Sequence, residues 1–158
     1  MNHIDIKLVA SDDHSVLSLI ADWYHDEWGI PVADTVNNLR AVTADIYQFQ
    51  MLLFVDGRAV ATGGVYDHVG LLNHKPELNI YKKWLAQLYT IPGERGNGYG
   101  IRLCKQIQDH CRALALEKIY LFTHTAGPMY QKLGWSIIQR LTISNRNIAV
   151  MEKILSIL

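Results

Sequence analysis

The segment from Trp84 to Leu103, WLAQLYTIPGERGNGYGIRL, limits the possible folds of this chain more than any other. Its largely apolar first part, residues 84–91, is typical of a β-strand, and Pro92 and Gly93 end that strand. A glycine-dense turn follows at residues 95–100, RGNGYG. A helix is predicted next, because apolar residues then recur three or four positions apart, at Ile101, Cys104, Ile107, Cys111 and Leu114.

A strand, a glycine turn and a helix in this order direct free backbone N–H groups towards an anion, at the positive end of the helix dipole. Glycine permits the tight turn and a close approach to phosphate oxygens, because it has no Cβ. We therefore predict a phosphorylated ligand. The alternative is a solvated glycine turn that binds nothing.

Two common phosphate motifs do not fit this turn. A Walker loop needs lysine and then serine or threonine after its last glycine, whereas Tyr99 and Gly100 follow Gly98 here. A dinucleotide fingerprint needs G-x-G-x-x-G, but the alternating glycines of this turn leave Leu103 at the last glycine position. The ligand is thus predicted to be neither a Walker-bound nucleotide nor a dinucleotide.

Length and composition favour one domain, residues 1–158, with a buried core: the chain has 158 residues, of which 49% are hydrophobic and 19% charged. Its formal net charge is zero, so we expect neither a nucleic-acid partner nor a membrane surface. No apolar run reaches membrane-spanning length, and the acidic start of the chain does not resemble a signal peptide. Cys104 and Cys111 are about 10 Å apart along the predicted helix, too far for a disulfide. Free thiols indicate a cytoplasmic location.

The first half of the chain is predicted to begin with a strand and two helices. The strand runs from Ile4 to Ala10, and residues 11–13 supply capping side chains for a helix with apolar spacing over Val16 to Trp28. Gly29 ends that helix, and a second helical pattern runs from Asp34 to about Phe49.

A hairpin is predicted next, with strands at Met51–Val55 and Ala59–Tyr66 around a strong Asp56-Gly57 turn. Gly63-Gly64 indicates a bulge or a close backbone approach within the second strand. Residues 67–83 are predicted to be a surface loop, with a short strand or helical turn left open. After the central helix we expect a strand at Lys118–Thr123, a helix at Thr125–Leu133 and a hairpin of Trp135–Ser144 with Ile148–Ile154 around residues 145–147.

The glycine turn reads Arg-x-x-Gly-x-Gly after a strand that ends Tyr-Thr-Ile-Pro, and this closely resembles the acyl-coenzyme-A loop of the GNAT N-acetyltransferases. A second segment, residues 126–135, AGPMYQKLGW, is similar to that family's Ala-x-x-x-Tyr-x-x-x-Gly-Phe/Trp signature. The order of predicted elements resembles the family over nearly the full length. The resemblance implies an α/β (α+β) fold: a central mixed, mostly antiparallel sheet of six to seven strands, splayed at the central strand and flanked by about four helices.

The same resemblance implies how acetyl-CoA would bind. Backbone groups of Leu88, Tyr89 and Thr90 would pair with the pantetheine arm, and the Leu88 N–H would polarise the thioester carbonyl. The pyrophosphate would bind the amides of the glycine turn, with a further contact from the Arg95 side chain. The residues expected there are Arg95, Gly96, Asn97, Gly98, Tyr99, Gly100 and Ile101.

Tyr130 corresponds to the family residue that protonates the departing thiolate; the alternative is a packing tyrosine. Some relatives place a glutamate or histidine, as the general base, at the positions of Trp84 and Ala86, and neither side chain titrates here. The candidates for the base are Asp67, His68, Glu77 and His124, of which His124 is placed first, or a carboxylate acting through water. No metal-ligand spacing is found, so no metal is expected.

The acceptor is predicted to be a primary amine of a small molecule or peptide. Residues 23–28, WYHDEW, are rich in aromatic and acidic side chains, which suits a cationic amine. Trp28, Glu27 and Glu77 are the candidate acceptor residues; alternatively Trp23 and Trp28 are core residues and the acids are solvated. Other readings left open are a non-catalytic acyl-CoA-binding sensor or partner module and a purely structural domain. Whether the chain forms a homodimer is also open.

Overall fold

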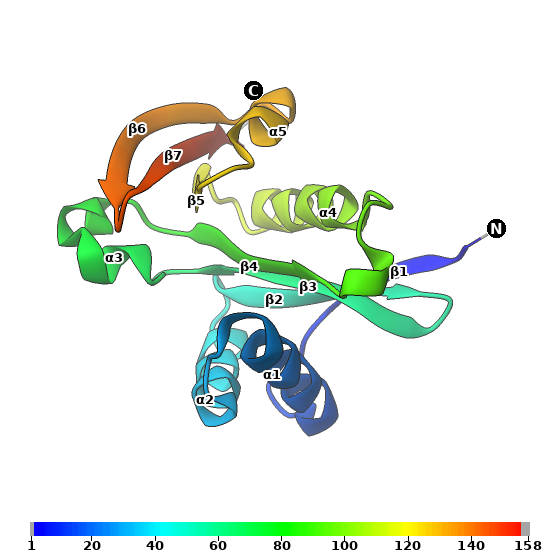
Figure 1. The fold of residues 1–158 in the computed structure, drawn as a ribbon. Coiled ribbons are helices and arrows are strands. Elements are labelled where there is room, and N and C mark those ends of the chain that lie inside the picture. The colour runs from blue at the N-terminus through cyan, green and yellow to red at the C-terminus, as the bar shows by residue number, and fades with distance from the viewer. Residues whose placement is uncertain (1, 156–158) are drawn as a thin grey trace. The chain divides into compact units, whose positions relative to one another are not determined.

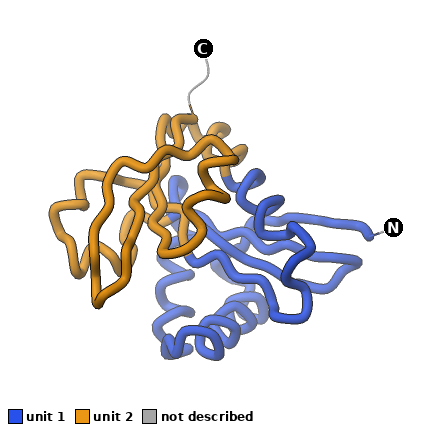
Figure 2. The backbone as a smooth tube through the Cα atoms, turned by 45° about the horizontal axis from the view of Figure 1, so that its top comes forward, with its two compact units in different colours: residues 1–65, 87–107 blue, residues 66–86, 108–158 orange. Residues whose placement is uncertain are grey.

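Residues 2–155 are described by a computed structural model, in which the chain forms two compact units (Figure 2). The first unit contains the chain up to residue 65 together with residues 87–107, and the second contains residues 66–86 and 108–158. Each unit therefore joins segments that are distant in the sequence.

Within residues 2–155, seven strands hydrogen-bond in the order β1-β2-β3-β4-β5-β7-β6. The pairs β1–β2, β2–β3, β5–β7 and β6–β7 are antiparallel, and the pair β4–β5 is parallel. The strands are β1 (Ile4–Leu8), β2 (Phe49–Val55), β3 (Arg58–Tyr66), β4 (Trp84–Thr90), β5 (Lys118–Thr123), β6 (Ser136–Ile143) and β7 (Arg146–Ile154). The predicted mixed, mostly antiparallel sheet of six to seven strands is confirmed.

In the first unit, α1 (His14–Trp28) and α2 (Val32–Thr43) lie side by side on one face of β1, β2 and β3 (Figure 1). The predicted start and end of α1 are close to the observed ones. The Asp13 carboxylate accepts a hydrogen bond from the Val16 N–H, and Gly29 ends the helix with a φ of 69°. Apolar side chains of α1, α2 and β2 form the core between these layers, including Leu17, Ile20, Leu39 and Leu52.

The second helix is shorter than its sequence pattern predicts. It ends at Thr43 and not near Phe49, since residues 49–55 form β2. The Asp45 carboxylate accepts hydrogen bonds from the Tyr47 N–H at 2.7 Å and from the Gln48 side chain at 3.1 Å, and these bonds stabilise a turn. Pairing of β2 with β1 and β3 outweighs the helical spacing that continues past Thr43.

The β2–β3 hairpin forms at Asp56 and Gly57, as predicted, with φ values of 50° and 83°. The irregularity in this pair lies between Leu53 and Phe54 on β2, so the bulge alternative for Gly63-Gly64 is wrong. Gly63 instead permits a close approach, because a Cβ at this position would overlap the Leu88 side chain. The absence of a side chain at Gly63 thus leaves room for the Leu88 side chain.

We expect Gly63→Ala to lower the free energy of unfolding by about 1–3 kcal/mol, the usual effect of adding a carbon to a packed site. The Leu88 side chain, whose terminal methyl group a Cβ would overlap, would have to move. Chemical denaturation measures the change. Gly70→Ala is the control: this residue has a φ of −56°, and an added Cβ would meet no heavy atom within 4 Å. Equal unfolding free energies for the two variants would contradict the close approach.

In the second unit, β5 pairs with β7 along its whole length and with β4 at Trp84 and Tyr120. The β6–β7 hairpin turns at Ser144 and Asn145, whose φ values are 51° and 64°. The predicted turn at residues 145–147 is therefore displaced, because Asn147 already pairs with Thr142. Short helices occupy the remaining segments: α3 (Leu71–His74), η1 (Pro76–Ile80) and α5 (Gly127–Lys132).

Two further elements follow β4 in the chain: η2 (Pro92–Glu94) and α4 (Tyr99–Ala113). The predicted apolar face of α4 is correct at its centre, where Cys104, Ile107 and Cys111 are buried. Neither cysteine forms a disulfide, as expected from their spacing. None of the helices within residues 2–155 combines the length and the apolar character needed to cross a bilayer.

Candidate functional site

The turn between η2 and α4 has the geometry of an anion site. Gly96 and Gly98 have φ values of 86° and 80°, a conformation that glycine adopts without strain. The first hydrogen bond of the helix runs from the Arg102 N–H to the Gly98 carbonyl, at 3.1 Å. Gly98 therefore lies at the start of α4, where the helix dipole is positive.

The backbone amides of residues 96–101 are available to a ligand. Within residues 2–155, none of these six N–H groups has a hydrogen-bond acceptor in the protein. The two polar side chains of the turn do not cap them, since Arg95 Nε donates to the Thr90 carbonyl at 2.8 Å and Asn97 Nδ2 donates to the Glu94 carbonyl at 3.1 Å. Unpaired N–H groups at a helix N-terminus are suited to phosphate oxygens.

The Arg95 side chain links this turn to the end of α1. Its Nη2 donates to the Glu27 carboxylate at 3.1 Å, and its guanidinium lies 5.4 Å from the centre of the Tyr89 ring. Two residues expected in different roles, Arg95 for the cofactor and Glu27 for the acceptor, are therefore ion-paired. An anion that bound the Arg95 guanidinium would compete with Glu27.

Aromatic side chains surround Tyr89 on the same unit. Its ring centre lies 5.6 Å from that of Trp23, 6.4 Å from Tyr24 and 6.1 Å from Trp28. Trp28 is 47% exposed, so the alternative that places it in the core is wrong. An exposed tryptophan face can receive a cationic amine.

The backbone of β4 has an unusual conformation at Gln87 that sequence analysis did not predict. Gln87 has a φ of 56°, which is rare for a residue other than glycine. Such a conformation is strained inside a strand. Its carbonyl accepts a hydrogen bond from the Tyr24 hydroxyl at 2.7 Å. The Gln50 side chain donates to that hydroxyl at 3.0 Å and to Thr62 Oγ1 at 2.8 Å. The one sequence signal for this network was a glutamine within the apolar strand FQMLLFV.

The remaining predicted residues belong to the second unit. Tyr130 is 8% exposed on α5, and its ring centre lies 6.0 Å from that of Trp135. His124 is exposed just after β5, and its Nδ1 lies 3.0 Å from the Asn147 carbonyl. A carbonyl can only accept, so Nδ1 donates in this contact, and Nε2 is the ring nitrogen left for a substrate.

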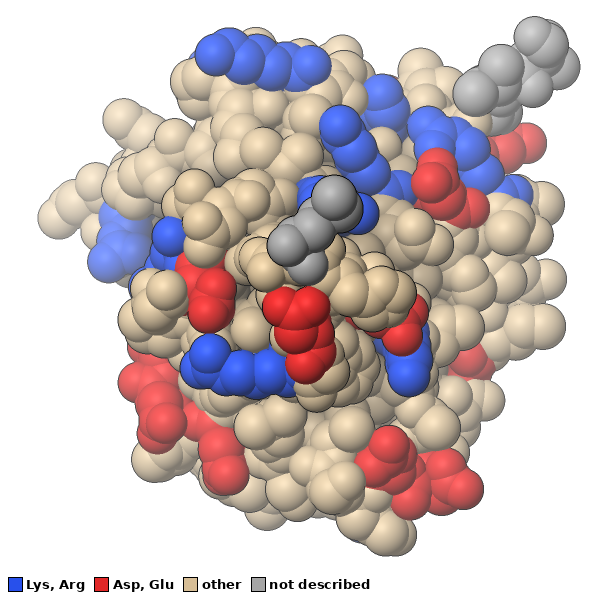
Figure 3. Space-filling view, turned by 90° about the vertical axis from the view of Figure 1, so that its right-hand side faces the viewer, with Lys and Arg blue, Asp and Glu red and all other residues tan. Residues whose placement is uncertain are grey.

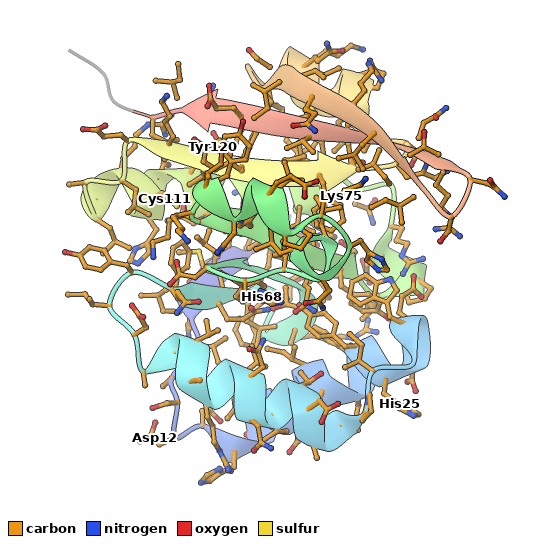
Figure 4. The ribbon with its side chains drawn as sticks, turned by 90° about the vertical axis from the view of Figure 1, so that its left-hand side faces the viewer. Asp12, His25, His68, Lys75, Cys111 and Tyr120 are labelled. Carbon is orange, nitrogen blue, oxygen red and sulfur yellow. The ribbon has the colours of Figure 1, made fainter. Side chains whose placement is uncertain are left out.

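The other candidates for the base differ in their surroundings. Asp67 forms an ion pair with Lys83, which occupies part of its carboxylate. Glu77, on η1, and His68, which follows β3, are exposed (His68 is labelled in Figure 4). Within residues 2–155, no group of three or more histidine, cysteine, aspartate or glutamate side chains is placed to hold a metal ion.

Two titratable groups outside the candidate site have shifted pKa values. Burial lowers the pKa of His110, on α4. Burial raises the pKa of Tyr120, on β5, and the nearby Glu152 carboxylate adds to this rise (Tyr120 is labelled in Figure 4). On the face in Figure 3, basic and acidic side chains both occur, and uncharged side chains separate them into small groups.

The sequence profile of the acetyltransferase (GNAT) family matches residues 14–135, more than half of the chain. The chain belongs to the GNAT family. It is an acyltransferase, and the fold and enzyme class that the sequence motifs predicted are confirmed. A comparison with curated proteins finds no match.

Solved structures of GNAT enzymes share the fold at low sequence identity. An aminoglycoside 6'-N-acetyltransferase complexed with coenzyme A is 16% identical, with a TM-score of 0.75 over 96% of this chain and 97% of that one. The ribosomal-protein-S18-alanine N-acetyltransferase from Escherichia coli is 14% identical, with a TM-score of 0.70 over 100% and 96%. A spermidine N-acetyltransferase from Vibrio cholerae is 13% identical, with a TM-score of 0.71 over 96% and 94%.

Proposed function

We propose that this GNAT enzyme transfers an acetyl group from acetyl-CoA to a primary amine of a small molecule or peptide. The single observation that carries the proposal is the turn at residues 96–101, where six backbone N–H groups at the start of α4 have no acceptor within the described chain. A diphosphate supplies several acceptor oxygens and two negative charges, and it suits these donors better than a monoanion does.

The residues of the first unit fit coenzyme A. An added Cβ at Gly96 or Gly98 would meet no heavy atom within 4 Å, so the turn is open to a ligand. The amides of residues 96–101 would hold the pyrophosphate, whereas the Arg95 N–H already donates to the Pro92 carbonyl. The backbone of Leu88, Tyr89 and Thr90 would pair with the pantetheine arm. Acetyl-CoA supplies an acyl group activated as a thioester.

The proposed reaction is direct transfer in a ternary complex. The amine nitrogen forms a bond to the thioester carbon, the carbon–sulfur bond breaks, and sulfur keeps the electron pair. The Leu88 N–H donates to the carbonyl oxygen while that oxygen carries negative charge. Tyr130 gives its phenolic proton to the thiolate, and the proton lost by the amine returns to the enzyme or to water. The products are the N-acetylated amine and coenzyme A.

His124 is our first candidate for the group that accepts the proton of the amine. Because Nδ1 donates to the Asn147 carbonyl, Nε2 is the ring nitrogen that would accept the proton. Trp28, Glu27 and Glu77 are the proposed acceptor contacts, and the aromatic and acidic character of the first two favours a cation. Buried Cys104 and Cys111 form no disulfide and support a reducing, cytoplasmic setting.

The proposal is tested by measuring coenzyme A release with a panel of amines: an aminoglycoside, spermidine, a peptide with a free N-terminus and a lysine-containing peptide. We expect release that depends on at least one amine and is absent with the N-acetylated form of that amine. Calorimetry with acetyl-CoA is run in parallel. Binding without release on any amine would contradict acetyl transfer to these acceptors and favour a sensor, and no binding would contradict the cofactor assignment.

A further inference from the structure

A buried chain of hydrogen bonds leads from the core of the first unit to the strained residue of β4. Tyr24, Gln50 and Thr62 are each fully buried, at 0% exposure. Thr62 Oγ1 donates to the Met51 carbonyl at 2.7 Å, and this bond is the inner end of the hydrogen-bond network. Gln50 then bridges Thr62 and Tyr24, and the Tyr24 hydroxyl donates to the Gln87 carbonyl.

The Gln87 carbonyl and the Leu88 N–H belong to the same peptide group. This group is planar, and because the bond is not cis, the carbonyl and the N–H point in opposite directions. A donor that holds the carbonyl therefore also fixes the direction of the N–H on the other edge. A hydrogen bond to the carbonyl further polarises the amide, which makes the N–H a stronger donor.

We propose that Tyr24 and Gln50 are positioning residues that orient and polarise the Leu88 N–H through the Gln87 carbonyl. This inference rests on the proposed function, in which that N–H stabilises the thioester oxygen. The Tyr24 hydroxyl accepts a hydrogen bond from Gln50 and donates one to the Gln87 carbonyl. The Leu88 N–H, on the opposite edge of the same peptide group, would then donate to the thioester oxygen. Neither side chain touches the substrate.

The local chemistry supports a role beyond packing. The Tyr24 ring lies in an apolar cluster with Leu17, Ile20 and Leu52, where phenylalanine would fill the same volume. Burying the amide of Gln50 and two hydroxyls is unfavourable unless every group is paired, so an apolar set would be simpler to fold. A φ of 56° at Gln87 is also unfavourable, and the Tyr24 hydrogen bond holds that conformation in place.

The test compares wild type with Tyr24→Phe, which keeps the ring and removes the hydroxyl. In the free protein, we expect the ¹H and ¹⁵N chemical shifts of the Leu88 amide to move and its hydrogen exchange to accelerate. With ¹³C-labelled acetyl-CoA bound, the thioester carbonyl stretch should lie at lower frequency in wild type than in solution. In Tyr24→Phe that shift should be smaller, and kcat should fall about tenfold while the affinity for acetyl-CoA stays within about twofold.

Tyr120→Phe is the control, because it removes a hydrogen-bonded hydroxyl from a buried tyrosine of β5 that has no proposed role. It should leave the carbonyl frequency, kcat and the Leu88 amide unchanged. Gln50→Met, of similar length, should give a smaller effect than Tyr24→Phe. The double variant should match Tyr24→Phe alone, because Gln50 acts through the hydroxyl.

The outcomes separate this inference from the proposed function. Wild type that fails to bind acetyl-CoA, or binds it without lowering the carbonyl frequency, would contradict both. A lowered frequency in wild type that Tyr24→Phe leaves unchanged would overturn the positioning role alone. If Tyr24→Phe does not fold, the frequency measured in Gln50→Met decides in the same way.

Discussion

Gly98→Val should lower the affinity for acetyl-CoA by about 5- to 150-fold. Gly98 has a φ of 80°, which valine reaches only with strain of about 1–3 kcal/mol, and each 1.4 kcal/mol changes a binding constant about tenfold. If valine instead relaxes the turn, the amides of residues 96–101 no longer converge on one anion, and the loss is larger. Isothermal titration calorimetry with acetyl-CoA measures the change.

Gly57→Val is the matched control for this prediction. Gly57 lies in the β2–β3 hairpin with a φ of 83°, and a Cβ at Gly57 or at Gly98 would meet no heavy atom within 4 Å. Both variants should therefore lose similar stability in thermal melts. Only Gly98→Val should lose affinity for acetyl-CoA, and an equal affinity in the two variants would remove the pyrophosphate assignment.

Tyr130→Phe should lower kcat by about 100-fold or more and leave the affinity for acetyl-CoA nearly unchanged. A positioned general acid accelerates a reaction by about 10²–10⁴-fold, and phenylalanine keeps the ring against Trp135 but has no proton to give. The rate is measured as coenzyme A release at a saturating concentration of the amine that the panel identifies.

Acyl donors with different thiols give a sharper test of the role of Tyr130. A donor whose thiol has a lower pKa needs less protonation as it leaves, so it should restore part of the rate in Tyr130→Phe. Tyr120→Phe serves as the control, since Tyr120 and Tyr130 are both 8% exposed and both belong to the second unit. Full activity in Tyr130→Phe would assign this tyrosine to packing.

Much of the fold follows from local sequence patterns. The β2–β3 hairpin forms where Asp56-Gly57 predicts it, because both residues accept a positive φ at low cost. The glycine turn and α4 follow β4 as expected, and β5 has the predicted bounds of Lys118–Thr123. The patterns failed where pairing between strands decided the outcome: residues 44–48 could continue a helix by spacing, yet β2 begins at Phe49.

The candidate site also has one part that the sequence predicts and another that only the tertiary structure shows. The sequence alone determined the anion turn, since glycine spacing and the start of a helix are local properties that bring unpaired N–H groups together. Only the tertiary structure revealed that Tyr24 holds the Gln87 carbonyl from 63 residues away and that Glu27 pairs with Arg95 across 68 residues. No spacing rule encodes such contacts, because their partners meet only once α1 packs against β2, β3 and β4. The strained peptide of Gln87 belongs with them: its conformation comes from the surrounding hydrogen bonds and not from the preference of glutamine.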